Sequence, residues 1–152
     1  QTLNLILASY SDLVEREHIT TPLLAQAPDC PPAFAFALHR LWRARAVAGV
    51  TSHRVTLQGP DNARVRGHFE ALLAGQRMLD AYWLSATDHA LRLHILLPLG
   101  SRLQAEGLLD RLATQLHAQH GAAFGDWALS AAVQPIDQPP ATLLAQLLGD
   151  SP

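Results

Sequence analysis

The residues most suited to binding or chemistry are Arg77 and Asp80, which are separated by two residues in the segment QRMLDAYWLS (76–85). A guanidinium can hold a phosphate, or the O6 and N7 edge of a guanine, through two parallel hydrogen bonds. A carboxylate close by can accept hydrogen bonds from N–H donors of the same ligand. The same spacing also suits a local ion pair, or an arginine that complements the dipole at a helix C-terminus. The pair therefore needs a structural context before it indicates a function.

The elements around this pair are indicated by hydrophobic periodicity and turn residues. We expect a helix at 62–76, strands at 81–85 and 90–98 joined by the turn ATDH, and an amphipathic helix at 101–121. Flanking strands at 52–58 and 126–136 complete a βαββαβ order. The prediction is an α/β (α+β) domain with a ferredoxin-like antiparallel sheet and helices packed on it. In this topology the two helices share one face of the sheet. The second helix carries an apolar stripe at helical spacing, formed by Ala105, Leu108, Leu109, Leu112 and Leu116.

The rest of the chain predicts a division near residue 30. A helix at 3–18 is followed by a proline-broken segment, TTPLLAQAPDCPP (20–32). We expect residues 1–30 to be a linker helix from a missing upstream domain with its connector, and residues 31–152 to be one domain with helices at 31–49 and 139–150 at its ends.

Composition excludes several functions. The 152 residues are 49% hydrophobic and 16% charged, with a formal net charge of −2, which is typical of a globular domain and argues against a nucleic-acid polymer as partner. The single cysteine, Cys30, cannot form an internal disulfide and is expected to be a loop residue, not a nucleophile. His117 and His120 have a spacing that can bind a metal, but no cysteine or carboxylate clearly completes the set, so we expect no metal site.

A second arginine, Arg111, places the Arg77–Asp80 pair in a recognisable order. Asp80 is followed by four residues, then by SATDH (85–89), then by a strand ending in proline, LHILLP (93–98), and Arg111 comes thirteen residues after that proline. This order resembles the GGDEF domain of diguanylate cyclases, in which an inhibitory Arg-x-x-Asp site precedes the GGDEF signature. The resemblance covers about residues 31–136. It implies that Arg77, Asp80 and Arg111 bind a ligand together.

Two departures from the family concern catalysis. SATDH (85–89) lacks both glycines that let the backbone of an active cyclase approach GTP. The first strand of the domain ends in Gln58, where the family has a metal-binding aspartate, and Asp61 follows only after Gly-Pro. The resemblance therefore implies a degenerate GGDEF domain that has no catalytic residues and no cofactor but keeps its inhibitory site.

With an inhibitory site but no catalytic site, the chain resembles the cyclic di-GMP receptors of the Pel exopolysaccharide system. A second candidate is the receptor of cellulose secretion, which also has a degenerate GGDEF domain. The resemblance implies a cytoplasmic, non-enzymatic domain of a protein anchored in the bacterial inner membrane. It also implies an upstream GAF-like domain in the same chain and subunits of a membrane-embedded polysaccharide synthase as partners. Two alternatives stay open: a structural docking module that has lost both sites, and an unusual nucleotide cyclase. Titration with cyclic di-GMP tests the first, and an assay with GTP and Mg²⁺ tests the second.

Overall fold

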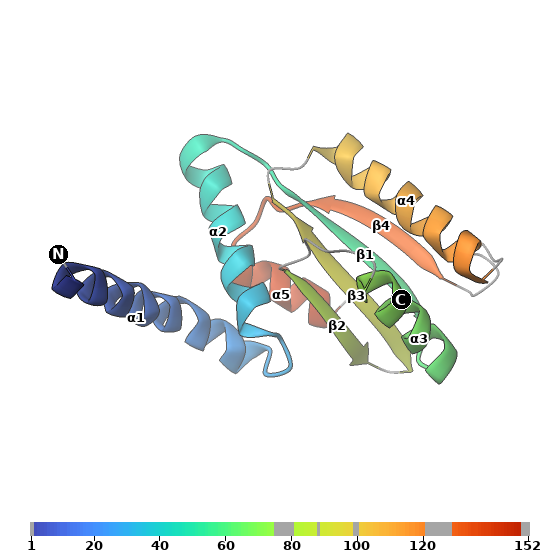
Figure 1. The fold of residues 1–152 in the computed structure, drawn as a ribbon, viewed down its shortest axis with the longest axis horizontal. Helices are drawn as coiled ribbons and strands as arrows, with labels where there is room; N and C mark the ends of the chain where they lie inside the picture. Colours follow the sequence, from blue (N-terminus) through green and yellow to red (C-terminus); the bar gives the residue numbers. More distant parts are fainter. Residues whose placement is uncertain (1, 75–80, 88, 99–100, 121–128, 150–152) are drawn as a thin grey trace.

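The computed structural model describes residues 2–74, 81–87, 89–98, 101–120 and 129–149 (Figure 1). Each helix and strand expected after residue 30 is present, with ends that differ by a few residues from the expected ones. The elements are, in chain order, α1 (Thr2–Gln26), α2 (Pro32–Ala48), β1 (His53–Pro60), α3 (Ala63–Ala74), β2 (Tyr82–Thr87), β3 (Ala90–Leu97), α4 (Arg102–His120), β4 (Ser130–Pro135) and α5 (Pro140–Gly149).

The four described strands form one antiparallel sheet in the order β2-β3-β1-β4. Strand β1 is central and pairs with β3 on one side and with β4 on the other. With α3 after β1 and α4 after β3, the connectivity is the βαββαβ unit expected from the sequence. The predicted α/β (α+β), ferredoxin-like fold class is confirmed.

Two helices of this unit begin at polar caps. The side-chain oxygen of Asn62 accepts a hydrogen bond from the backbone N–H of Val65 at 2.8 Å, at the start of α3. At the start of α4, the hydroxyl of Ser101 accepts from the N–H of Gln104 at 3.2 Å, while the Gln104 side chain accepts from the N–H of Ser101 at 2.9 Å. This reciprocal pair is a capping box. It fixes where α4 begins.

One face of the sheet is covered by α3 and α4, which contact each other (Figure 1). The side chains between them and the sheet are almost entirely aliphatic, and the predicted stripe of α4 is part of this core. The buried residues of this cluster include Val55, Leu57, Val65, Phe69, Leu72, Leu91, Leu93, Ile95, Ala105, Leu108, Leu112 and Leu116. The predicted packing of both helices on one face is confirmed.

The opposite face of the sheet carries a second core, formed with α1, α2 and α5. Phe34 of α2 is fully buried against Trp83 of β2, with ring centroids 5.7 Å apart in an edge-to-face arrangement. Leu144 and Leu147 of α5 belong to the same cluster. Both faces of the sheet are therefore covered by helices.

Helix α1 differs from the expectation for residues 20–32. It continues through Pro22 to Gln26, whereas the sequence predicts a proline-broken connector there. An internal proline destabilises a helix by about 3 kcal/mol, but burial of Leu23, and of Ala27 just after the helix, against α2 and α5 offsets this cost. In addition, Gln26 donates a side-chain hydrogen bond to the carbonyl of Ala141 in α5 at 2.8 Å. The end of α1 thus packs on the domain, and the division near residue 30 stays a prediction.

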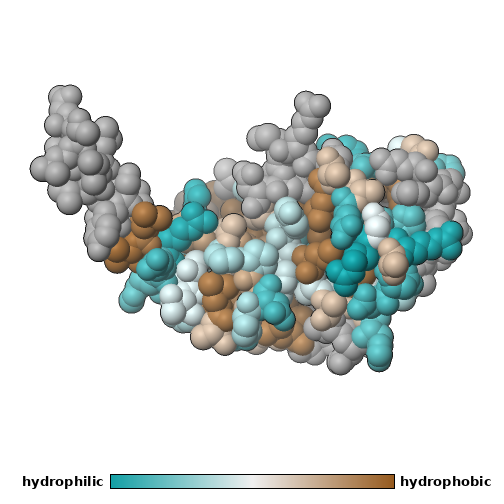
Figure 2. Space-filling view, turned by 60° about the horizontal axis from the view of Figure 1, so that its bottom comes forward, coloured by the Kyte–Doolittle hydropathy of each residue, from teal (hydrophilic) through white to brown (hydrophobic). Residues whose placement is uncertain are grey.

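The surface has no single dominating apolar area on the side seen in Figure 2, where hydrophobic residues form separate spots between hydrophilic ones. Among the helices that the structure describes, none combines the length and the apolar character that a membrane crossing requires.

Candidate ligand-binding site

Arg111 lies on α4, on the side of the helix that faces away from the sheet. Leu108 and Leu112 are buried in the aliphatic core, so they mark the side of α4 that faces the sheet. Arg111 lies on another side of the helix, and its side chain is exposed. Arg111 lines an open hollow of about 350 Å³ together with other residues of the same helix, namely Asp110, Thr114, Gln115 and Ala118. A ligand can therefore reach its guanidinium without any rearrangement of the core.

Gly107 lies one helical turn before Arg111 and leaves space beside it. A Cβ atom placed at Gly107 would meet no other atom within 4 Å. Glycine in a helix interior costs up to about 1 kcal/mol of stability relative to alanine. The helix therefore carries a less stabilising residue at Gly107, although an alanine side chain would fit there. The open surface next to Arg111 agrees with the room expected beside this arginine.

The other two predicted site residues, Arg77 and Asp80, lie outside the described residues. They belong to the chain between Ala74, where α3 ends, and Tyr82, where β2 begins. Because α3 and α4 contact each other, the helix that precedes the pair is a direct neighbour of the helix that carries Arg111. The grouping of the three side chains stays a prediction.

The positions that correspond to catalytic residues of the family hold other chemistry. Gln58, at the position expected for a metal-binding aspartate, accepts a hydrogen bond through Oε1 from Nε of Arg92 at 3.1 Å. The carboxylate of Asp61 pairs with Arg66 at 3.4 Å on the exposed surface. Within the described ranges, no group of three or more His, Cys, Asp or Glu side chains is placed to hold a metal ion.

The turn in place of the GGDEF signature is short. Strand β2 extends to Thr87, which pairs with Ala90 of β3, so only two residues connect the strands. His89 in this turn has a left-handed backbone with φ of 68°, a conformation that glycine adopts more easily. Its carbonyl accepts a hydrogen bond from the N–H of Asp61 at 2.7 Å, which ties the turn to the end of β1.

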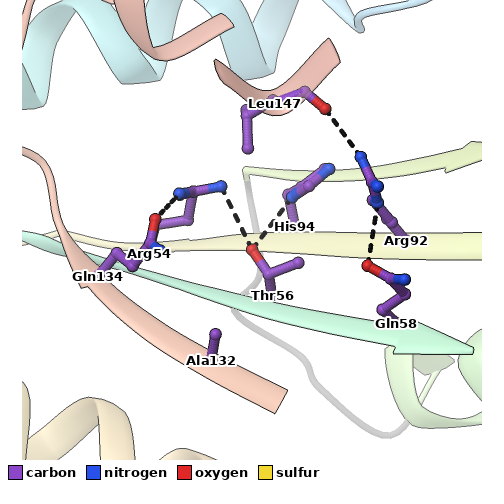
Figure 3. A pocket seen from close by; sticks show the side chains of 8 residues that line it. All are labelled: Arg54, Thr56, Gln58, Arg92, His94, Ala132, Gln134 and Leu147. Atoms are coloured by element: carbon purple, nitrogen blue, oxygen red, sulfur yellow. Dashed lines mark hydrogen bonds between the residues drawn. The ribbon is translucent and has the colours of Figure 1, made fainter. Parts of the chain in front are cut away.

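A polar cluster that was not predicted from the sequence lies on the sheet face opposite α3 and α4 (Figure 3). We define it as Arg54, Thr56, Gln58, Arg92, His94 and Gln134. Two of its members are arginines, and their hydrogen bonds to neutral acceptors are part of the contacts that hold them. Arg54 donates to the Thr56 hydroxyl at 3.4 Å and to Oε1 of Gln134. Besides its bond to Gln58, Arg92 donates to the carbonyl of Leu147 in α5 at 3.0 Å.

His94 joins this polar cluster to the aromatic part of the same core. Its Nδ1 lies 3.2 Å from the Thr56 hydroxyl oxygen, and its ring centroid lies 5.5 Å from that of Trp83. Burial lowers the pKa of His94 to about 3, and the charges of Arg54 and Arg92 act in the same direction. The imidazole is therefore neutral at physiological pH. Because Arg54 donates to the Thr56 oxygen, the Thr56 hydroxyl is free to donate to Nδ1 of this neutral ring.

The signal for this cluster was present in the sequence as polar residues at alternate positions of two strands. Arg54, Thr56 and Gln58 share one face of β1, and Arg92 and His94 share the same face of β3. Alternation alone does not tell a solvated face from a face covered by helices. His94 is 1% exposed, so its ring is packed inside the covered face.

Cys30 has the inert character expected of it. The side chain is buried between α1 and α2, and burial raises the pKa of the thiol to about 11. A thiol with this pKa is almost entirely protonated at neutral pH and is a poor nucleophile.

Comparison with known families and structures identifies the family to which the domain belongs. The family model for the PelD GGDEF domain matches residues 28–150, which is most of the chain.

The chain belongs to the PelD GGDEF domain family.

Solved structures of PelD have the same fold. The crystal structure of a PelD fragment from Pseudomonas aeruginosa PAO1 matches with a TM-score of 0.66 and 24% identity, over 77% of this chain and 43% of that one. A crystal structure of the PAO1 fragment in complex with c-di-GMP matches with a TM-score of 0.65 and 22% identity, over 76% and 42% of the two chains. The chain thus spans less than half of the length of these solved PelD chains. A search of curated protein sequences found no significant match.

The family assignment confirms the expected degenerate GGDEF domain and selects the Pel system over cellulose secretion. At this level of identity, the solved structures establish the fold that the two proteins share. What the domain binds depends on its own residues.

Proposed function

We propose that this domain is a non-catalytic receptor for cyclic di-GMP, which it binds with Arg77, Asp80 and Arg111. The observation that carries the proposal is the position of Arg111: an exposed guanidinium on α4, beside open surface at Gly107, on the helix that contacts α3. A PelD fragment with the same fold has been crystallised with c-di-GMP, which supports the same ligand here.

The chemistry of the three side chains suits the two guanines and two phosphates of this ligand. Arg77 would bond the O6 and N7 edge of a guanine or a phosphate, bidentately. Asp80 would accept from the N1–H and the N2 amine of guanine, which are donors. Arg111 would contact a phosphate or stack on a purine face. The proposal assigns no step of bond formation to any of them.

The absence of an enzymatic role is part of the proposal. Gln58 is engaged by Arg92, and the described residues hold no cluster of metal ligands. A two-metal reaction on GTP needs carboxylates that bridge its metal ions. We expect no cyclic di-GMP to form when the protein is incubated with GTP and Mg²⁺.

In the cell, the domain would pass ligand binding on to exopolysaccharide synthesis and export. We propose further that it lies in the cytoplasm as part of a longer protein anchored in the inner membrane, which its membership of the PelD GGDEF family supports. Its partners would be an upstream GAF-like domain of the same chain and the subunits of a membrane-embedded polysaccharide synthase.

The test is isothermal titration of cyclic di-GMP into the wild type and single alanine variants. Arg77→Ala, Asp80→Ala and Arg111→Ala are each expected to weaken binding by about tenfold or more, because loss of a bidentate contact costs about 1–3 kcal/mol. Arg102→Ala is the matched control, since Arg102 is also exposed on α4 and pairs only with Glu106 in its own helix among the ion pairs of the described chain.

Two outcomes would contradict the proposal. A well-folded wild type that binds no cyclic di-GMP, both as this chain and with its upstream domain restored, would leave a structural docking module as the best account. Equal losses in Arg111→Ala and Arg102→Ala would show that α4 attracts the ligand only through general charge.

A further inference from the structure

The polar cluster surrounds a cavity of about 190 Å³ between the sheet and α5 (Figure 3). Side chains of three strands and one helix contribute to its wall. The lining residues are Arg54, Thr56, Gln58, Arg92, His94, Ala132, Gln134 and Leu147. This cavity lies on the face of the sheet opposite α3 and α4, and so is separate from the hollow beside Arg111.

The two arginines of the cavity are deeply buried and hydrogen-bonded. Arg54 is 5% exposed and Arg92 is 4% exposed. Gln134 and Thr56 orient the first guanidinium, while Gln58 and the Leu147 carbonyl orient the second. A guanidinium has five N–H donors in a fixed plane, so it can be held by neighbouring side chains and still bond a ligand. The donors of this site are therefore positioned before any ligand arrives.

The electrostatic field in the cavity favours a negative charge. Two buried guanidiniums line one small cavity beside the sheet, where charges interact more strongly than in bulk water. Burial is the main cause of the low pKa of His94, and the charges of Arg54 and Arg92 lower this pKa further, in agreement with a positive field at the ring. A neutral ring can also donate from Nε2 to an oxyanion when Thr56 occupies Nδ1.

Solvent can reach the cavity along the edge of the sheet. Ala132 and Gln134 lie on β4, which is the edge strand next to β1, and both residues are exposed. Ala132 pairs with Thr56 across the two strands, so its small side chain stands beside the polar wall. The cavity is smaller than the roughly 300–1,000 Å³ of a pocket for a drug-sized ligand, which makes it too small for a cyclic dinucleotide.

We propose that this cavity is a binding site for a small oxyanion, such as inorganic phosphate or a short carboxylate, held between Arg54 and Arg92. The anion would accept charge-assisted hydrogen bonds from both guanidiniums. Because the site joins β1, β3, β4 and α5, its occupation would stabilise the seam between the sheet and α5.

The experiment is a thermal unfolding series with phosphate and, separately, with acetate and succinate, at constant ionic strength maintained with NaCl. A ligand that binds the folded chain raises the unfolding midpoint with its concentration, in a saturating manner. We expect this rise in the wild type, and the phosphate and carboxylate series identify which oxyanion is preferred. Direct titration of the preferred anion by ³¹P or ¹H NMR measures its Kd.

Ala132→Leu is the key variant, since a larger side chain there fills the cavity and leaves both arginines unchanged. We expect it to fold and to bind the anion at least tenfold more weakly, while its affinity for cyclic di-GMP stays as in the wild type. Arg111→Ala is expected to do the reverse. The proposal is overturned if the wild type responds to phosphate and carboxylates no more than to chloride. It is overturned equally if Ala132→Leu binds the anion as tightly as the wild type.

Discussion

The two faces of the sheet bury side chains of different chemistry. Toward α3 and α4, the strands present Val55, Leu93 and Ile95, all with 1% exposure or less. Toward α2 and α5, the same strands present Arg54, Arg92 and His94, whose exposure is 5% or less. Strand β3 is therefore buried at every position except its last, although only every second residue faces the aliphatic core beneath α3 and α4.

The aliphatic face contributes mainly to the stability of the fold, whereas the polar face can contribute to the selectivity of ligand binding. Aliphatic packing stabilises the fold without direction, in proportion to the area that leaves water. A buried polar cluster contributes less net stability, because each charged group first loses its hydration. What the polar face adds is a set of fixed hydrogen-bond directions. Arg111 of the proposed cyclic di-GMP site and the proposed oxyanion site thus lie on opposite sides of the sheet.

The largest expected effect comes from truncating the aliphatic face. Leu93→Ala removes a fully buried side chain, and we expect it to lower the free energy of unfolding by about 2–5 kcal/mol through lost transfer energy and a residual cavity. Urea unfolding measures this change. Leu103→Ala is the control, because Leu103 is 77% exposed on α4 and should change stability by no more than about 0.5 kcal/mol. A small loss in Leu93→Ala would mean that the two faces do not differ as described.

The polar face should instead show itself through pH. The pKa of His94 in the folded chain, about 3, lies below the ordinary value of 6.5. Between these values the unfolded chain binds a proton that the folded chain does not, so stability falls as pH falls from about 6.5 toward 3. This loss can reach about 1.4 kcal/mol per pH unit for one proton.

We expect His94→Gln to remove this part of the acid sensitivity, measured as the slope of unfolding free energy between pH 6.5 and 4.5. His117→Gln, which changes an exposed histidine of α4, should leave the slope as in the wild type. Equal slopes in the wild type and His94→Gln would show that His94 takes up a proton in the folded chain and that the cluster is less isolated from water than its burial indicates.

The smallest effect concerns the outer surface of α4. Gly107→Ala should stabilise the protein by up to about 1 kcal/mol, because alanine has the higher helix propensity and meets no atom there within 4 Å. Gly67→Ala in α3 is the matched control, since this position is equally open. The stabilities of both variants are measured by thermal unfolding.

A larger residue at the same two positions sharpens the comparison. Gly107→Leu should weaken cyclic di-GMP binding, since the side chain would fill the space beside Arg111, whereas Gly67→Leu should not. If both leucine variants bind as the wild type does, the ligand does not approach α4 at Gly107.

Much of the fold could be predicted from local patterns. Alternation in β1 and β3, and the stripe on α4, place each element within a few residues of its observed position. The continuation of α1 through Pro22 could not be predicted in this way, because it depends on the burial of Leu23 against helices far along the chain. Local preference for a break is outweighed there by tertiary packing.

The candidate sites show the same limit. Arg111 could be found because its spacing from Pro98 matches the order of a known family, and its exposure on α4 fits that role. The polar cluster could not be predicted in this way, because its members come from three strands. Arg54, for example, donates a hydrogen bond to Gln134, which lies more than half the chain length away in sequence. No window of sequence contains both ends of that bond.

The strand order has a kinetic consequence. The β2–β3 hairpin joins Thr87 to Ala90, which are close in sequence, whereas β1 joins His53 to Pro135 across more than half of the chain. Contacts of long sequence separation form slowly, because the loop between them must close first. The cavity between Arg54 and Gln134 is therefore complete only when β4 docks. If the cavity forms after the transition state of folding, an anion bound there should slow unfolding and leave the rate of folding almost unchanged.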